Sequence, residues 1–188
     1  MNSSLFDAIN ELAGHSPAFD RLAEDAARYG ALLVILMAAC FWFVGRSREQ
    51  RAVNRTIVLS AAIAGALSLL LAQAIGHFYY HPRPFVERGD VVQLLGHAAD
   101  SSFPSEHAAG AFAVAGSVFW LRRGWGLLAL GVATLVGLAR IYAGIHYPAD
   151  ILAGVAIGLA ASYLVGLGRP LLRRVELVAR QFMPPPLR

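Results

Sequence analysis

Long apolar segments are the feature that most constrains how this chain can fold. Five of them, rich in Leu, Ala, Val, Ile and Gly, occupy much of the 188 residues, and only 15% of the chain is charged. A helix needs about 20 largely apolar residues to cross the hydrocarbon layer of a bilayer. With their flanks the segments reach that length, which predicts an all-α, polytopic membrane helix bundle of about five transmembrane helices. They cover residues 29–44, 56–78, 104–121, 125–145 and 148–167.

The segments on either side of the predicted spans are more polar. Leu5, Phe6, Ile9 and Leu12 recur at helical spacing within residues 3–13. This pattern indicates a short amphipathic helix that lies on the membrane surface, and a second short helix is expected before the first span. The length suits one domain, residues 1–188. Within it we expect interfacial helices in residues 1–28, the transmembrane bundle in 29–167 and a basic cytoplasmic tail in 168–188.

The placement of arginine predicts which way the bundle faces. All 16 basic residues are Arg, and most of them lie in the 45–55 loop, the 122–123 turn and the tail. These places alternate along the chain with the N-terminus, the 79–103 loop and the 146–149 turn. Loops rich in Arg stay on the cytoplasmic side of a membrane, so the second group is expected to face outward. A basic excess confined to short loops also argues against a nucleic-acid partner.

Three ionisable residues stand where the fourth predicted span ends and the fifth begins, namely Arg140, His146 and Asp150. Such residues are costly in lipid and mark a functional site by default. Pro148 suits the first turn of a helix, which leaves His146 just outside that helix and Asp150 inside its first turn. Asp150 could hold one ring nitrogen of His146 while the other acts on a substrate as nucleophile or base. The alternative is a capping Asp and a His that merely reaches the interface.

A second motif is His-Pro-Arg-Pro-Phe at residues 81–85, just past the second predicted span. Arg83 lies between two prolines, which stiffen the backbone and aim the side chain. Its planar guanidinium group offers paired donors that suit phosphate oxygens. Taken singly, this motif also fits an Arg that anchors a helix at the membrane boundary.

The third motif opens the third predicted span, at residues 101–110. We expect Ser102 to cap the helix and Pro104 to lie in its first turn. The free N–H groups at this helix start form an anion site, to which Ser105 can add a hydroxyl donor. His107 could pass a proton to a leaving oxygen. Taken singly, the motif also fits an ordinary capped helix.

Together the three motifs bring Arg, His, Asp and Ser side chains and a helix N-terminus to one side of the membrane. This set indicates a phosphate-ester site with one histidine as nucleophile and a second as acid/base. No matching cluster of carboxylates for Mg²⁺ is evident in the sequence, so we expect a mechanism without metal or other cofactor. A zinc site from His107, His146 and Asp150 is the alternative, and Arg83 and Arg140 oppose it because they would repel a dication.

The motifs carry a resemblance to a known family. Arg83-Pro84, Pro104-Ser105-x-His107 and Arg140-x5-His146-x3-Asp150 resemble the three-part signature of the type 2 phosphatidic acid phosphatase superfamily. Within it, the chain is similar to bacterial undecaprenyl-diphosphate phosphatases of the bacitracin-resistance type, over roughly residues 5–175. The closest likeness lies in residues 81–85, 99–107 and 146–150, together with the overall size and the amphipathic N-terminus.

The resemblance implies a role for each motif residue. His146 would attack phosphorus and form a phosphohistidine, oriented by Asp150, while His107 would protonate the leaving group and then activate water. The phosphoryl oxygens would be held by backbone N–H groups and by Arg83, Arg140 and Ser105. Fixed positive donors suit the charge that spreads over these oxygens in the transition state.

Three positions depart from the pattern of the superfamily. Gly76 stands where the broad superfamily has a Lys, and Ala139 stands where it has a Ser. Glu106 stands where the commonest second motif has Gly. A carboxylate there is a second candidate acid/base or substrate contact, typical of the diphosphatase branch. His77 and His81 could replace the missing Lys charge, although both also fit simple interfacial histidines.

The sequence thus predicts metal-independent hydrolysis of undecaprenyl diphosphate to undecaprenyl phosphate and inorganic phosphate, which recycles the lipid carrier for cell-wall synthesis. The enzyme would span the bacterial cytoplasmic membrane with its active site outward, and its partners would be the polyprenyl diphosphate and membrane lipids. One alternative is a phosphatase or phosphotransferase for phosphatidylglycerophosphate, phosphatidate or another lipid phosphate. Another class is a small transporter or proton pathway. The sequence does not indicate an oligomeric state.

Overall fold

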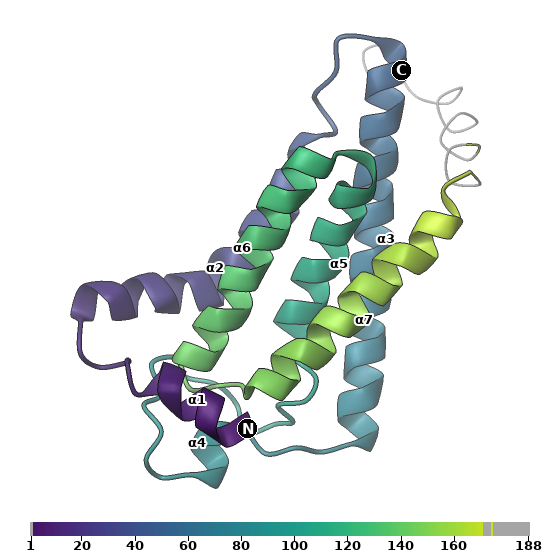
Figure 1. Cartoon of the computed structure of the whole chain (residues 1–188). Helices are drawn as coiled ribbons and strands as arrows, with labels where there is room; N and C mark the ends of the chain where they lie inside the picture. The colour runs from purple at the N-terminus through teal and green to yellow at the C-terminus, as the bar shows by residue number, and fades with distance from the viewer. Residues whose placement is uncertain (1, 171–173, 175–188) are drawn as a thin grey trace.

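The computed structural model describes residues 2–170 and residue 174, and all regular elements in these residues are helices. The prediction of an all-α bundle is confirmed. Five long helices form the bundle and two short ones, α1 and α4, lie at one end of it (Figure 1). In chain order they are α1 (Asn2–Asn10), α2 (Pro17–Cys40), α3 (Arg48–Phe78), α4 (Pro84–Glu87), α5 (Glu106–Leu121), α6 (Arg123–Tyr142) and α7 (Pro148–Leu167).

Local sequence explains where several helices begin. Pro84 and Pro148 stand in the first turn of α4 and α7, where a missing N–H costs no hydrogen bond. Ser47 and Ser105 precede α3 and α5, and each side chain accepts the N–H of the residue three positions on. These caps satisfy one of the free donors at a helix start.

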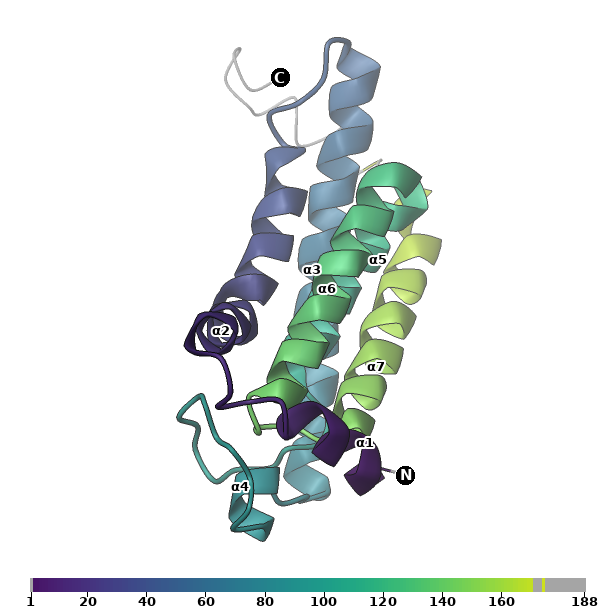
Figure 2. The same ribbon diagram turned by 60° about the vertical axis from the view of Figure 1, so that its left-hand side comes forward.

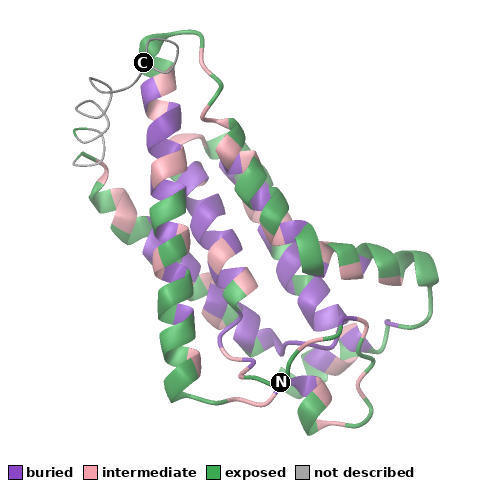
Figure 3. Ribbon diagram, turned by 180° about the vertical axis from the view of Figure 1, so that it is seen from behind, coloured by how far each residue is buried: buried purple, intermediate pink, exposed green. Residues whose placement is uncertain are grey.

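Helix α5 is the centre of the bundle. It packs against α2, α3, α6 and α7, and almost all of residues 108–118 are buried, as the violet inner helix of Figure 3 illustrates. A helix that is apolar all round is an inner helix. On α7, Gly154 lies so close to α5 that a Cβ there would stand 2.6 Å from the carbonyl oxygen of Ser105. Small residues permit this approach, which fixes the relative positions of His107 on α5 and Asp150 on α7.

Three helices, α3, α6 and α7, are long and apolar enough to cross a membrane, and the chain is an integral membrane protein. The other two predicted spans correspond to the second half of α2 and to α5, which has 16 residues. The helix that contains the predicted span 56–78 starts earlier, at Arg48, so the basic segment before the span is helical too. With 31 residues, α3 is about 46 Å long at 1.5 Å per residue and exceeds the hydrocarbon thickness.

The first predicted span and the short helix before it are one continuous helix. Helix α2 starts at Pro17, and its first part projects sideways from the bundle before the helix bends and follows α6 (Figures 1 and 2). Gly30 lets α2 approach α6, since a Cβ at this position would overlap the side chain of Val136. Packing against α6 therefore keeps the chain helical near residue 29, where the mixed polarity of the sequence suggested a boundary between two helices.

One face of the N-terminal helix packs on the rest of the protein, and the other face is exposed. Phe6, expected to rest on lipid, is fully buried, and its ring centroid is 5.1 Å from that of Tyr147. Asn10 is buried too and bonds to the backbone of Val92 and Tyr142. Leu5 and other apolar side chains of this region remain exposed. The sequence pattern showed an apolar stripe but not that the protein itself supplies part of the surface that covers it.

The predicted grouping of loops at two ends is confirmed by the arrangement of the helices. The N-terminal helix α1, α4 and the α6–α7 turn lie at one end of the bundle, and the α2–α3 connection and the α5–α6 turn lie at the other (Figure 1). The predicted basic tail, 168–188, falls almost entirely outside the described residues. All three polar motifs are therefore at the end opposite the Arg-rich connections.

Candidate active site

His146 lies at the centre of the site, in the tight turn between α6 and α7. The turn is possible because Gly144 adopts φ +75°, a conformation that disfavours side chains. The His146 side chain is almost completely buried, and its Nε2 is 3.2 Å from Nη1 of Arg83 and 3.3 Å from Nη2 of Arg140. A guanidinium group can only donate, so Nε2 carries the lone pair and the ring proton is on Nδ1. Nε2 is thus the nitrogen available as a nucleophile.

Asp150 stands behind the ring of His146, on the side away from the arginines. Its Oδ2 accepts the backbone N–H of Tyr147 at 2.8 Å and lies 3.5 Å from Nδ1 of His146. This places a carboxylate opposite the protonated nitrogen, as the motif spacing suggested, at a distance slightly too long for a hydrogen bond. The backbone carbonyl of Asp150 also accepts the N–H of Ser105 at 3.0 Å, which joins the start of α5 to the start of α7.

Arg83 is aimed at His146 by contacts on three sides. Its Nε donates to Oδ1 of Asp100 at 2.8 Å, and its Nη1 donates to the carbonyl of Ile145 at 2.9 Å. Its Nη2 donates to the carbonyl of Ser101 at 3.2 Å. Only 4% of the residue is exposed. A buried guanidinium group held in this way is a preorganised anion site, because the side chain does not have to reorganise when a ligand binds.

Arg140 approaches from the end of α6. It is 2% exposed, and its Nη1 donates to the carbonyl of Ala27 on α2 at 3.1 Å. Its Nε has no hydrogen-bond partner in the described part of the chain. A buried guanidinium donor without a partner is costly, so this side chain retains capacity for an anionic ligand.

The second histidine, His107, lies in the first turn of α5. This helix starts at Glu106 and is capped by Ser105, not by Ser102 as the sequence suggested. The Ser102 hydroxyl instead contacts Nδ1 of His81 at 2.9 Å and donates to the carbonyl of Pro82. Both serines are acceptable caps by residue type, and tertiary contacts with residues 81–82 decide between them. Pro104 therefore precedes the helix.

Most of the predicted site residues surround one polar cavity of about 320 Å³. Asp150 and Ser105 are fully buried behind it, and the Ser105 hydroxyl serves as the α5 cap. The lining also includes the α3 face that carries Gly76, where a Cβ would meet the carbonyl oxygen of Phe103 at 3.2 Å. The predicted residues that line the cavity are Arg83, Glu106, His107, Arg140 and His146.

Several polar residues of the cavity were not predicted as site residues. His97 and Asp100 come from the long loop before α5, and Gln73 comes from the last turns of α3. His77, considered above only as a replacement for the missing Lys charge, also lines the cavity. Outside the cavity lining, Glu87 at the end of α4 accepts a 2.7 Å hydrogen bond from the Tyr147 hydroxyl. The loop carries no periodic pattern, so the sequence offered only the presence of titratable side chains as a signal.

Burial and positive charge set the protonation of the loop histidines. Burial, followed by the charges of Arg140 and Arg83, holds the pKa of His146 well below its usual value of 6.5. The pKa of His97 is also lowered, first by burial and then by Arg83. His146 is therefore neutral at pH 7, the form in which its Nε2 lone pair can attack phosphorus.

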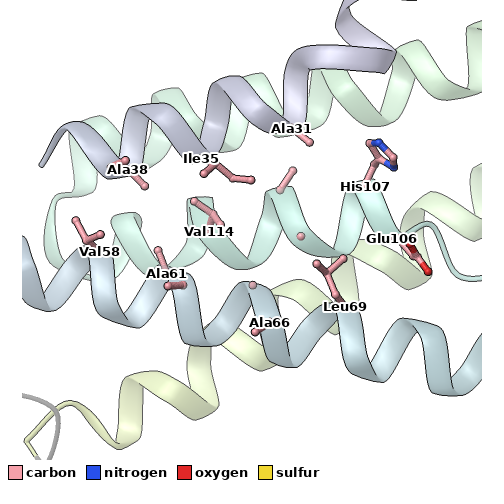
Figure 4. Close-up of a pocket in the computed structure, with 15 residues that line it drawn as sticks. Ala31, Ile35, Ala38, Val58, Ala61, Ala66, Leu69, Glu106, His107 and Val114 are labelled. Carbon is pink, nitrogen blue, oxygen red and sulfur yellow. The ribbon is translucent and has the colours of Figure 1, made fainter. Parts of the chain in front are cut away.

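An apolar groove of about 570 Å³ adjoins the polar cavity. It runs between α2 and α3 over α5, and its floor and walls are mostly Ala and Gly (Figure 4). Glu106 and His107 stand at one end of the groove, and Ala38 and Val58 stand at the other. These same two residues, Glu106 and His107, also line the polar cavity. The two spaces thus meet at the start of α5.

Two guanidinium groups next to a neutral histidine favour an anion over a cation. Within residues 2–170 and 174, no three His, Cys, Asp or Glu side chains are grouped closely enough to hold a metal ion. The combination of an anion site, a nucleophilic nitrogen and an apolar groove, set at the end of a membrane bundle, has the chemistry of an integral membrane phosphatase.

Comparison with known proteins defines the family. The sequence matches the PAP2 superfamily over residues 54–172, and the chain belongs to this superfamily. It is 34% identical over 183 residues to undecaprenyl-diphosphatase BcrC of Bacillus subtilis (strain 168), and the match covers 96% of this chain and 91% of that protein. It is 36% identical over 160 residues to the putative undecaprenyl-diphosphatase YbjG of Escherichia coli (strain K12), covering 85% and 78% of the two chains.

A solved structure has the same fold. The crystal structure of Aquifex aeolicus LpxE superposes with a TM-score of 0.73 at 28% identity and covers 87% of this chain and 93% of that one. These comparisons confirm the resemblance drawn from the three motifs, and the chain is a lipid phosphatase of the PAP2 type. Membership of this phosphatase family favours an enzyme over the alternative of a transporter or proton pathway.

Proposed function

We propose that this enzyme hydrolyses undecaprenyl diphosphate to undecaprenyl phosphate and inorganic phosphate. The observation that carries the proposal is the junction at Glu106 and His107, where a cationic cavity opens into an apolar groove. A diphosphate on a single long hydrocarbon tail fits this shape, with its charged end in the cavity and its first prenyl units in the groove. The two undecaprenyl-diphosphatase relatives support the same substrate.

The reaction starts with attack on the terminal phosphorus. With the anionic diphosphate bound, His107 is protonated. Nε2 of neutral His146 forms the N–P bond as the bridging P–O bond breaks, and protonated His107 gives its proton to the leaving undecaprenyl phosphate. The Nδ1 proton of His146 faces Asp150 throughout, and this carboxylate stabilises the positive charge that develops on the ring. The product of this half-reaction is a phosphohistidine.

The second half-reaction releases phosphate. His107, now neutral, takes a proton from water, and the resulting oxygen nucleophile attacks the phosphorus of the phosphohistidine. The N–P bond breaks, His146 returns to its neutral form, and inorganic phosphate leaves. The same histidine thus acts as acid in the first step and as base in the second.

The arginines change partners during this cycle. In the free enzyme, Arg83 and Arg140 donate to Nε2 of His146 at 3.2 and 3.3 Å. A bound phosphoryl group offers negatively charged oxygens, which are stronger acceptors than a neutral imidazole. The guanidinium donors would then hold the equatorial oxygens and release the Nε2 lone pair for attack. Substrate binding itself thereby activates the nucleophile.

The site is proposed to face outward from a bacterial cytoplasmic membrane. The Arg-rich connections and the site lie at opposite ends of the bundle (Figure 1), and basic loops stay on the cytoplasmic side. The charged headgroup then remains at the wet boundary while the tail reaches the groove laterally from the bilayer. No metal takes part in the proposed steps.

The test is phosphate release by the purified protein in detergent with excess chelator. Undecaprenyl diphosphate, undecaprenyl monophosphate, phosphatidate and phosphatidylglycerophosphate serve as parallel substrates. The proposal predicts the highest kcat/KM for the diphosphate and no loss of activity with chelator. A higher kcat/KM for either glycerolipid would assign the enzyme to the other substrate class. His146→Ala and His107→Ala are each expected to abolish turnover in a folded, inserted protein.

A further inference from the structure

The polar cavity contains more polar groups than the transfer of one phosphoryl group requires. Arg83, Arg140, His107 and His146 supply the charge, the acid/base and the nucleophile. His97 adds a further imidazole to the same lining, from the loop between α4 and α5. It belongs to none of the three motifs, and the mechanism above leaves it without a role.

His97 is held in a defined orientation. Its Nδ1 lies 3.2 Å from the carbonyl oxygen of Ala98 and 3.6 Å from Oδ1 of Asp100. Asp100 also accepts the Nε–H of Arg83, so the imidazole and the guanidinium share one carboxylate. Only 24% of the His97 side chain is exposed. Because Nδ1 faces these oxygens, Nε2 is the ring nitrogen left for a ligand.

A diphosphate presents a second phosphate that a monophosphate lacks. When the terminal phosphorus is next to His146, the phosphate attached to the tail must lie toward His107 and the groove. Its oxygens are then inside a partly closed cavity and need donors of their own, since burying an unpaired charge is costly. Arg83 and Arg140 are already engaged with the terminal group.

We propose that Nε2 of His97 binds the tail-linked phosphate of the diphosphate and sets the preference of the enzyme for diphosphates over monophosphates. This inference rests on the proposed function and extends it to the residue that selects the substrate. His97 acts as a specificity-determining residue, and Asp100 acts as the positioning residue for both His97 and Arg83.

The charge state of His97 supports this role. Burial and then the charge of Arg83 lower its pKa, so the ring is neutral before substrate binds. The negative charge of a second phosphate next to Nε2 offsets the positive charge of both arginines and favours protonation of the His97 ring. The Nε2–H group then donates to a phosphate oxygen. The facing groups are Arg83 and Arg140, which disfavour the proton, Asp100, which favours it, and the neighbouring imidazoles His107 and His146.

His77 is the other imidazole in the cavity lining outside the motifs, and it is a weaker candidate. It lies on the last turn of α3 and is exposed, and its ring contacts Phe78 with centroids 5.2 Å apart. No hydrogen bond orients its ring within the described residues. An unanchored side chain loses more conformational entropy on binding a ligand, so His97 is better prepared to hold the second phosphate.

The test compares farnesyl diphosphate with farnesyl monophosphate on the wild type and on His97→Ala. We expect kcat/KM for the diphosphate to fall by about tenfold to a hundredfold, the effect of losing one hydrogen bond to a charged group. The value for the monophosphate should change by less than about threefold. His97→Gln keeps an N–H donor and should recover part of the loss. The matched control is His15→Ala, an exposed histidine whose Nδ1 also faces a backbone carbonyl, that of Ala13 at 3.3 Å.

The outcomes separate this inference from the proposed function. If the wild type releases no phosphate from the diphosphate while it hydrolyses monoesters, the proposed function fails, and the inference fails with it. If the wild type prefers the diphosphate and His97→Ala keeps that preference, only the inference is wrong. Equal losses on both substrates, or the same effect in His15→Ala, would also overturn it, because a purely structural role moves both substrates together.

Discussion

The close packing of α7 on α5 makes a quantitative prediction about catalysis. Gly154 lies one turn after Asp150, and a Cβ there would stand 2.6 Å from the carbonyl oxygen of Ser105 and 2.9 Å from Cβ of Ala108. Ordinary contacts of this kind begin at 3.4 Å, so in Gly154→Ala the helices would separate locally by about 0.8 Å, the difference between the two distances. The neighbouring atoms are mostly backbone and cannot rotate away.

This separation acts directly on the geometry of the reaction, because α5 carries His107 and α7 begins right after His146. A misplacement of about 1 Å between reacting groups can cost a hundredfold in rate, and we expect kcat of Gly154→Ala to fall by about that factor. The effect on stability should be smaller. Overpacking costs about 1–3 kcal/mol, and the better helix propensity of Ala offsets about 0.8–1 kcal/mol of it.

The assay is phosphate release under saturating substrate, together with thermal unfolding of the same detergent preparation. The matched control is Gly131→Ala on α6, where a Cβ would meet no atom within 4 Å. The control should keep wild-type kcat and gain slightly in thermal stability. A kcat for Gly154→Ala within about threefold of the wild type in a folded protein would refute the reasoning, as would an equal loss in the control.

Two further predictions concern the groove and the protonation of the nucleophile. Ala66 lies on the groove wall (Figure 4). Ala66→Leu should raise KM for undecaprenyl diphosphate by several-fold, roughly the worth of one displaced apolar contact, and should raise KM for farnesyl diphosphate less. Equal effects on both lipids would argue against a tail in the groove. The pKa of His146 is lowered in the folded protein. Below about pH 6.5, His146 is therefore protonated in the unfolded chain but remains neutral in the folded one. Stability should therefore fall as pH drops from about 7.5 to about 5.5, and less so in His146→Gln; equal losses by thermal unfolding would contradict the shift.

The sequence was most informative where motifs and membrane topology reinforced each other. Arg83, His107 and His146 are far apart in the chain, yet each motif stands at a span boundary, and alternating spans place all of them at one end of the bundle. The prediction needed no packing detail, only the rule that a polar residue at a membrane boundary avoids lipid. Their convergence on one cavity in the structure follows from that placement.

Sequence alone could not identify features that depend on tertiary contacts. Ser102 and Ser105 are equivalent as caps by residue type, and only the contact of Ser102 with His81 assigns the cap to Ser105. His97 and Asp100 lie in an irregular loop, where nothing but the folded path brings them to the cavity. The continuity of α2 depends similarly on its contact with α6 at Gly30.

Direct detection of the covalent intermediate tests the account most sharply. The protein is mixed rapidly with undecaprenyl diphosphate, quenched without acid to preserve an N–P bond, and the phosphorylated residue is located by peptide mass spectrometry. We expect a phosphoryl group on His146 that forms and decays with turnover and is missing in His146→Ala. Phosphate release without any phosphorylated residue, a phosphoryl group on another side chain, or turnover by His146→Ala would contradict it.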